Sequence, residues 1–177
     1  MNRAAGDADR PGARGVDPSR ASRSPLGSHD LRQRALRLLA RREHSRVELG
    51  RKLKVHSESD ETLTALLDAL EQGGLLSDAR YAEQRTGVRA SRLGNARLAH
   101  ELRTKGVDAA IIDAALDAAG SESDRARAVW LKKFGALPAS REDWARQARF
   151  LQSRGFSTDT IRNILDDRDQ DDDRSAD

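Results

Sequence analysis

The sequence predicts an all-α protein, built as an elongated array of three tandem three-helix repeats. Its 177 residues are dominated by Ala, Leu, Arg, Glu and Asp, which favour helices. Aromatic residues make up only 3% and Cys is absent, so one large layered core, a disulfide scaffold and a Cys-based metal site are excluded. No stretch approaches the roughly 20 apolar residues that span a membrane, and no apolar signal region is present. We therefore expect a cytoplasmic protein without a membrane partner.

The repeat emerges when the chain is shifted along itself by 49 residues. Leu53 then falls on Leu102, and a second shift of the same length places Leu102 on Leu151. The second shift also places Gly106 on Gly155. One spacing kept across two comparisons without a gap indicates three copies of one unit. The predicted units cover residues 30–76, 77–120 and 121–166.

The first unit should contain three helices. The first of them is expected over residues 30–43. Ser45 and Glu48 have the spacing of a capping box, which would open the second helix. Asp60 is expected to cap the third helix, and the Gly-Gly pair at 73–74 should end it.

The second and third units follow the same plan. Ser77 or Asp78 should cap the first helix of the second unit, and Asp108 its last helix. In the third unit Pro138 forces a break between the first two helices. The other expected helices cover residues 96–105, 121–134, 141–154 and 157–166.

The apolar stripe of each helix is narrow, so neighbouring units are expected to share one core, as in other helical arrays. The side chains expected to face inward are Leu31, Ala35, Leu38, Leu39, Val47, Leu49, Leu53, Leu63, Leu66, Leu67, Leu70, Tyr81, Ile111, Ile112, Ala115, Leu116, Ala128, Val129 and Leu131, with Trp130 as a further candidate.

Two segments outside the units should be disordered. Residues 1–29 hold three of the four prolines among Gly, Ser, Asp and Arg, and residues 167–177 form an acidic tail. The tail is expected to be a solubilising segment or, alternatively, a mimic of nucleic acid that competes for a basic face. Residues 31–165 carry a net charge of +7, and basic residues outnumber acidic ones by 9 to 2 within 31–56.

No group of residues with catalytic chemistry is present. The chain has no phosphate-binding loop, no dinucleotide fingerprint, no nucleophile elbow and no Cys. Its histidines are isolated in sequence, and none has two further ligands at the spacing of a helical zinc site. We expect no metal, no cofactor, no small-molecule substrate and no enzymatic activity, so the function should be binding.

A basic surface is the best candidate for that binding. Arg85, Arg89 and Arg92 have i, i+4, i+7 spacing, so they should share one helix face that tracks phosphates or meets an acidic protein. Because five of the six aromatics lie in the third unit, as core candidates, any contact with single- or double-stranded DNA should involve its backbone. The residues expected to bind a partner are Arg85, Arg89, Arg92, Arg97, Lys105, Arg51 and Lys52.

Two alternatives remain at this point. One is a DNA-binding protein without sequence preference. The other is a transcriptional regulator, because the first two expected helices have the size of a helix-turn-helix. Only Arg46 stands where a recognition helix would read bases, which disfavours the second alternative.

Four stretches resemble one known family. SRVELGRKL at 45–53 resembles the first-unit signature of the RecX family, regulators of the RecA recombinase. LLSDARYA at 75–82, LGNARLAHELRTKGV at 93–107 and FLQSRGFSTDTI at 150–161 resemble its later signatures. The similarity covers residues 30–166, in order and with the family's spacing.

The resemblance implies a specific function. Members of the RecX family are curved arrays of three three-helix repeats that lie in the helical groove of the RecA–DNA filament. They suppress ATP hydrolysis, strand exchange and repressor cleavage in DNA repair and recombination, and they can promote filament disassembly. The RecA filament is therefore the implied partner, and the seven basic residues would face acidic filament surface or DNA phosphates.

Overall fold

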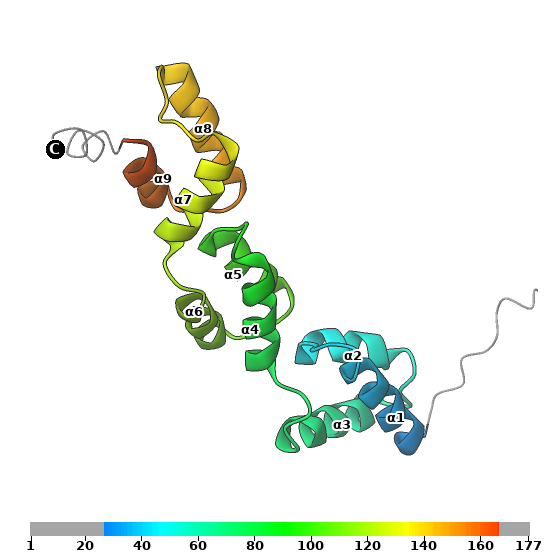
Figure 1. Cartoon of the computed structure of the whole chain (residues 1–177). Helices are drawn as coiled ribbons and strands as arrows, with labels where there is room; N and C mark the ends of the chain where they lie inside the picture. Colours follow the sequence, from blue (N-terminus) through cyan, green and yellow to red (C-terminus); the bar gives the residue numbers. More distant parts are fainter. Residues whose placement is uncertain (1–26, 167–177) are drawn as a thin grey trace, which may run out of the picture.

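The computed structural model describes residues 27–166, which contain nine α-helices and no strand. Figure 1 shows three successive bundles along an elongated molecule, which confirms the predicted all-α array. The first helix begins at Ser28, two residues before its predicted start. Residues 1–26 of the arm expected over 1–29, and the tail expected over 167–177, lie outside the described residues. The helices are α1 (Ser28–Leu39), α2 (Arg46–Lys54), α3 (Asp60–Gln72), α4 (Asp78–Arg89), α5 (Asn95–Thr104), α6 (Ala109–Ala118), α7 (Glu122–Lys133), α8 (Arg141–Ser153) and α9 (Thr158–Leu165).

Side-chain caps fix where most of these helices begin, because they satisfy N–H groups that have no partner within the helix. The predicted capping box is half formed. The Ser45 hydroxyl accepts from the Glu48 N–H at 3.1 Å, but the Glu48 carboxylate accepts two hydrogen bonds from Arg42 instead. Ser59 rather than the predicted Asp60 caps α3. The capping residues are Ser45, Ser59, Ser77, Asp108, Ser121, Ser140 and Ser157.

Each unit has an apolar core of its own, contrary to the expectation of one shared core. The extensive helix–helix contacts of the described chain all lie within units. Narrow stripes suffice because a residue that follows a glycine turn completes each core: Leu76, Val107 and Phe156 are 2%, 5% and 3% exposed. The three cores include Leu31, Leu49, Leu53 and Leu70; Tyr81, Leu102 and Ile112; and Trp130, Leu151, Phe156, Ile161, Ile164 and Leu165.

The buried face of α7 differs from the predicted one. Ala126 and Trp130 are buried, whereas Leu131 is 51% exposed and Ala128 is exposed as well. The 49-residue spacing holds for the buried Leu53, Leu102 and Leu151 of the second helices and for the starts of the third helices, but not for the first helices. The turns that precede the second helices cover 40–45, 90–94 and 134–140, and their unequal lengths shift the first helix relative to the repeat.

The units are joined by hydrogen bonds at the start of a second helix. At the first joint the Arg46 N–H donates to Asp78 Oδ1 at 2.7 Å, and the Ser45 hydroxyl donates to the Lys105 carbonyl at 2.7 Å. Burial raises the pKa of Asp78. The Lys105 carbonyl belongs to the turn between α5 and α6, so the N-terminus of α2 rests on the second unit.

The second joint repeats this design 49 residues further on. Gly94, which takes the place of Ser45, provides no side-chain cap, and the third unit caps α5 instead. The Gly94 N–H donates to the Arg154 carbonyl at 2.9 Å, and the Asn95 N–H donates to Glu122 Oε1 at 2.6 Å. Only glycine permits this approach, since a Cβ on residue 94 would lie 2.2 Å from the Gly155 oxygen.

Gly87→Ala is expected to stabilise the second unit. Gly87 lies inside α4, and a Cβ there meets no atom within 4 Å. Alanine restricts the unfolded chain and favours the helix, so the free energy of unfolding should rise by about 0.5–1 kcal/mol. Urea unfolding followed by circular dichroism measures the change. An unchanged or lower value would contradict the prediction.

Candidate interaction surface

The predicted arginine stripe of the second unit is not continuous. The last residue of α4 is Arg89, so Arg92 lies in the following turn rather than on the same helix. Arg89 Nη2 donates to Glu101 Oε1 at 2.8 Å, and Arg97 Nε lies 3.8 Å from the same oxygen. The Glu101 carboxylate thus ties Arg89 of α4 to α5 and partly neutralises two of the arginines expected to meet a partner.

The other predicted residues differ in how available they are. Arg51, Arg85 and Arg92 are exposed and take part in no ion pair among residues 27–166. The Lys52 ammonium lies 3.0 Å from His44 Nε2 and 3.7 Å from Glu48 Oε1, so it is held within the first unit. Lys105 is half-buried at the end of α5. Three exposed arginines outside any ion pair of residues 27–166 therefore remain from the predicted set.

The His44 imidazole is buried behind Lys52 and is 2% exposed. Its Nδ1 lies 2.9 Å from the Arg42 carbonyl, which can only accept, so Nδ1 carries the proton and Nε2 accepts from Lys52. Burial first, and then the charges of Arg42 and Lys52, lower the pKa of His44. The Arg42 guanidinium lowers the pKa of Glu48 to about 2.

Acidification should destabilise the protein through His44. In the unfolded chain His44 takes up a proton near pH 6.5, whereas in the folded protein its pKa lies lower. The unfolded state then binds more protons, so the free energy of unfolding falls as pH drops below 6.5. Urea unfolding between about pH 7.5 and pH 5.5 measures this slope. His44→Gln should flatten it and His100→Gln, at an exposed position on α5, should not; equal slopes in both variants would contradict the assignment.

Sequence reasoning missed two basic sites. Arg34, Arg37 and Arg41 surround Leu38 in a shallow hollow of about 460 Å³ along α1. Their i, i+3, i+7 spacing was the available signal.

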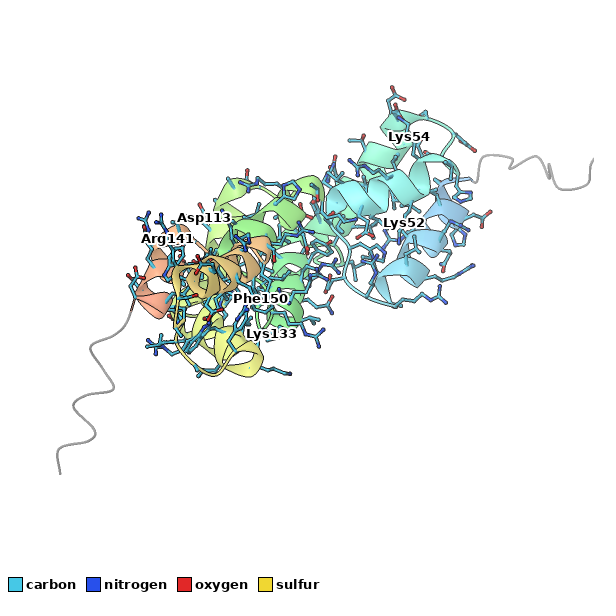
Figure 2. The ribbon with its side chains drawn as sticks, turned by 90° about the horizontal axis from the view of Figure 1, so that it is seen from above. Lys52, Lys54, Asp113, Lys133, Arg141 and Phe150 are labelled. Carbon is cyan, nitrogen blue, oxygen red and sulfur yellow. The ribbon has the colours of Figure 1, made fainter. Side chains whose placement is uncertain are left out.

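The second missed site is a groove of about 640 Å³ between the end of α4 and the third unit, and Arg92, Lys132, Lys133 and Arg154 line it. Figure 2 shows Lys133 beside Phe150, which also lines the groove. The signal here was the four-residue spacing of Phe150 and Arg154.

An exposed apolar side chain lies beside Arg85. Val88 is 73% exposed and lies three residues after Arg85, hence on the same side of α4.

Among residues 27–166 no His, Asp and Glu side chains gather in a set that could hold a metal ion. In the same range, every helix is too short or too polar to cross a membrane.

Comparisons with known proteins identify the family. Models of the second and third three-helix domains of RecX match residues 77–116 and 121–165. The regulatory protein RecX of Leptothrix cholodnii is 48% identical over 136 residues, which cover 76% of this chain and 87% of the relative. The chain belongs to the RecX family. The resemblance read from the sequence is thereby confirmed, and the two RecX models begin at Ser77 and Ser121, the caps of α4 and α7.

Further RecX proteins extend the comparison. The regulatory protein RecX of Ralstonia nicotianae is 46% identical over 144 residues, which cover 81% of this chain and 89% of the relative. The crystal structure of RecX from Lactobacillus salivarius superposes with a TM-score of 0.69 at 22% identity, and the match covers 79% of this chain and 95% of that one. At this identity the structural match supports the fold alone.

Proposed function

We propose that this RecX protein is a non-enzymatic regulator of the RecA recombinase, which docks in the helical groove of the RecA–DNA filament. There it lowers ATP hydrolysis, strand exchange and coprotease activity, in the cytoplasm and in the service of DNA repair. The observation that carries the proposal is the 48% identity with a regulatory protein RecX, joined to an elongated array of three units. DNA phosphates are a second partner of the same protein.

The exposed side chains of the first two units support a protein partner. Arg51 on α2 and Arg85 on α4 are free to meet acidic groups, and Val88 offers an apolar contact beside Arg85. An exposed valine makes no favourable contact with a charged phosphate backbone, whereas an apolar patch on a protein surface would bury it. We therefore assign these residues to the filament protein rather than to its DNA.

The test is ATP hydrolysis by the cognate RecA on single-stranded DNA, with this protein titrated from far below equimolar amounts. Inhibition at such low ratios supports action on the filament, at its ends or across several protomers. Inhibition that begins only when the protein coats the DNA indicates competition for phosphates. That outcome would favour the DNA-binding alternative over the RecA assignment.

The double variant Arg51→Glu/Arg85→Glu should weaken inhibition by about tenfold, because two cations at the rim of the interface become repulsive. The measurement is the protein concentration that halves RecA ATP hydrolysis. Arg149→Glu/Arg162→Glu is the matched control, since both residues are exposed on the third unit and the charge change is the same. Equal inhibition by the two double variants would count against this surface.

A further inference from the structure

The groove between the second and third units has a strongly one-sided charge. Arg92 approaches from the turn after α4, Lys132 and Lys133 from the last turn of α7, and Arg154 from the end of α8. The other lining side chains are Ser91, Ala128, Val129 and Phe150, so no carboxylate neutralises the cations from within the groove.

This clustering of positive charge is unfavourable in the protein alone and favours the binding of a polyanion. Four cations from three separate segments line one groove and repel one another, and no contact within the described residues relieves Lys132 or Lys133. A ligand with several negative charges along its length would relieve them together. A phosphodiester backbone has this form.

The Arg154 guanidinium lies over the Phe150 ring within the groove. Its central carbon lies 3.7 Å from the centre of the Phe150 ring, and the Phe150 ring in turn meets Phe134 edge-on, with 5.1 Å between ring centres. Since Phe150 lies on one side of the guanidinium, a planar ligand in the groove would stack on its other side. Nucleic-acid bases stack on arginine planes of this kind only when they are not paired in a duplex.

We propose that this groove binds single-stranded DNA, with Lys132, Lys133 and Arg92 on the phosphates and one unpaired base stacked on Arg154. The inference deepens the DNA contact of the proposed function and rests on it, but it requires no RecA. It keeps Arg92 of the expected stripe but moves the rest of the DNA contact to the third unit, because Glu101 pairs with Arg89 and Arg97 of the second.

The test uses the full chain and a fluorescent oligo-dT, with no RecA present, and measures fluorescence anisotropy over a series of salt concentrations. Lys132→Gln/Lys133→Gln should weaken binding by roughly tenfold or more. It should also reduce the slope of log affinity against log salt by about 1.4, because each phosphate contact on a single strand contributes about 0.7. Arg149→Gln/Arg162→Gln, with the same change in charge outside the groove, should leave the slope near that of the wild type.

A separate variant tests the stacking of a base on Arg154. Arg154→Lys keeps the charge and removes the planar face, so affinity for oligo-dT should fall by about fivefold or more, while affinity for a duplex of equal length changes little. Circular dichroism checks that every variant is folded.

Three results would overturn the inference. The first is the absence of oligo-dT binding, and the second is equal affinity in the groove variant and its control. The third is tight binding of a poly-aspartate peptide, with an affinity equal to that of oligo-dT, that is lost in the variant Lys132→Gln/Lys133→Gln. That result would make the groove a site for an acidic protein.

RecA inhibition measured with the same variants separates the two proposals. A variant that loses DNA binding but still inhibits RecA leaves the proposed function intact and supports a separate DNA groove. A wild-type protein that binds oligo-dT through the groove but never inhibits RecA contradicts the proposed function alone.

Discussion

Gly94→Ala is expected to open the joint between the second and third units while every unit stays folded. Residue 94 has φ −81° and ψ 168°, a conformation that alanine adopts without strain. The added Cβ would, however, lie 2.2–2.3 Å from backbone atoms of Gly155 and Phe156, which cannot rotate away. Relief requires the two units to move apart, which breaks the hydrogen bonds from Gly94 and Ala96 to the turn between α8 and α9.

The expected destabilisation of the joint is about 1–3 kcal/mol, the usual cost of overpacking a tight contact. Hydrogen exchange should show faster exchange at the amides of residues 94–96, and small-angle X-ray scattering should show a larger radius of gyration. Inhibition of RecA by Gly94→Ala should also be weaker than that by the wild type, because an array with a loose joint no longer presents three units in one fixed arrangement. Gly87→Ala is the matched control, since it adds the same methyl group to the same unit in open space. Unchanged exchange at these amides would show that the joint tolerates the methyl group.

Trp130→Ala should unfold the third unit and leave the first two folded. Trp130 is 5% exposed within the third core, so its truncation should cost about 3–5 kcal/mol. Its Nε1 also donates to the Gln147 side-chain oxygen at 2.6 Å, and Gln147 is buried. The variant leaves that oxygen without its donor, which adds about 1–3 kcal/mol unless water enters the cavity.

The remaining tryptophan reports on this unit alone, because Trp144 lies on α8 and the first two units contain no tryptophan. In Trp130→Ala the fluorescence transition in urea should occur well before the loss of helical circular dichroism from the other units. Leu131→Ala is the control, since Leu131 is 51% exposed and its truncation should change stability by no more than about 0.5 kcal/mol. A single cooperative transition by both probes would mean that the units are coupled more strongly than their separate cores indicate.

The fold could be predicted because its determinants are local or periodic. Serines and aspartates at helix starts, glycines at helix ends and a leucine spacing of 49 residues are properties of the chain itself. The prediction failed where a helix could shift relative to that spacing. On α7 the longer turn that follows, 134–140, shifts the helix so that Ala126 and Trp130 face inward in place of Leu131.

The candidate site was harder to predict, because charge in a sequence does not show which charges are already paired. Arg89 and Glu101 are 12 residues apart and on different helices, so no spacing within one helix predicts their ion pair. Arg92 and Lys132 are 40 residues apart in the chain and meet only because the second joint places α7 beside the end of α4.

The sequence by itself therefore determined the helices, the three units and the family, since capping, helical periodicity and repeat spacing act over a few residues or recur at a constant interval. Only the tertiary structure decided which arginines are neutralised, that each unit has a core of its own, and where a basic groove forms. These properties depend on the distance between side chains from different helices. In the groove that distance is set by a joint in which Gly94 and Gly155 allow two backbones to touch.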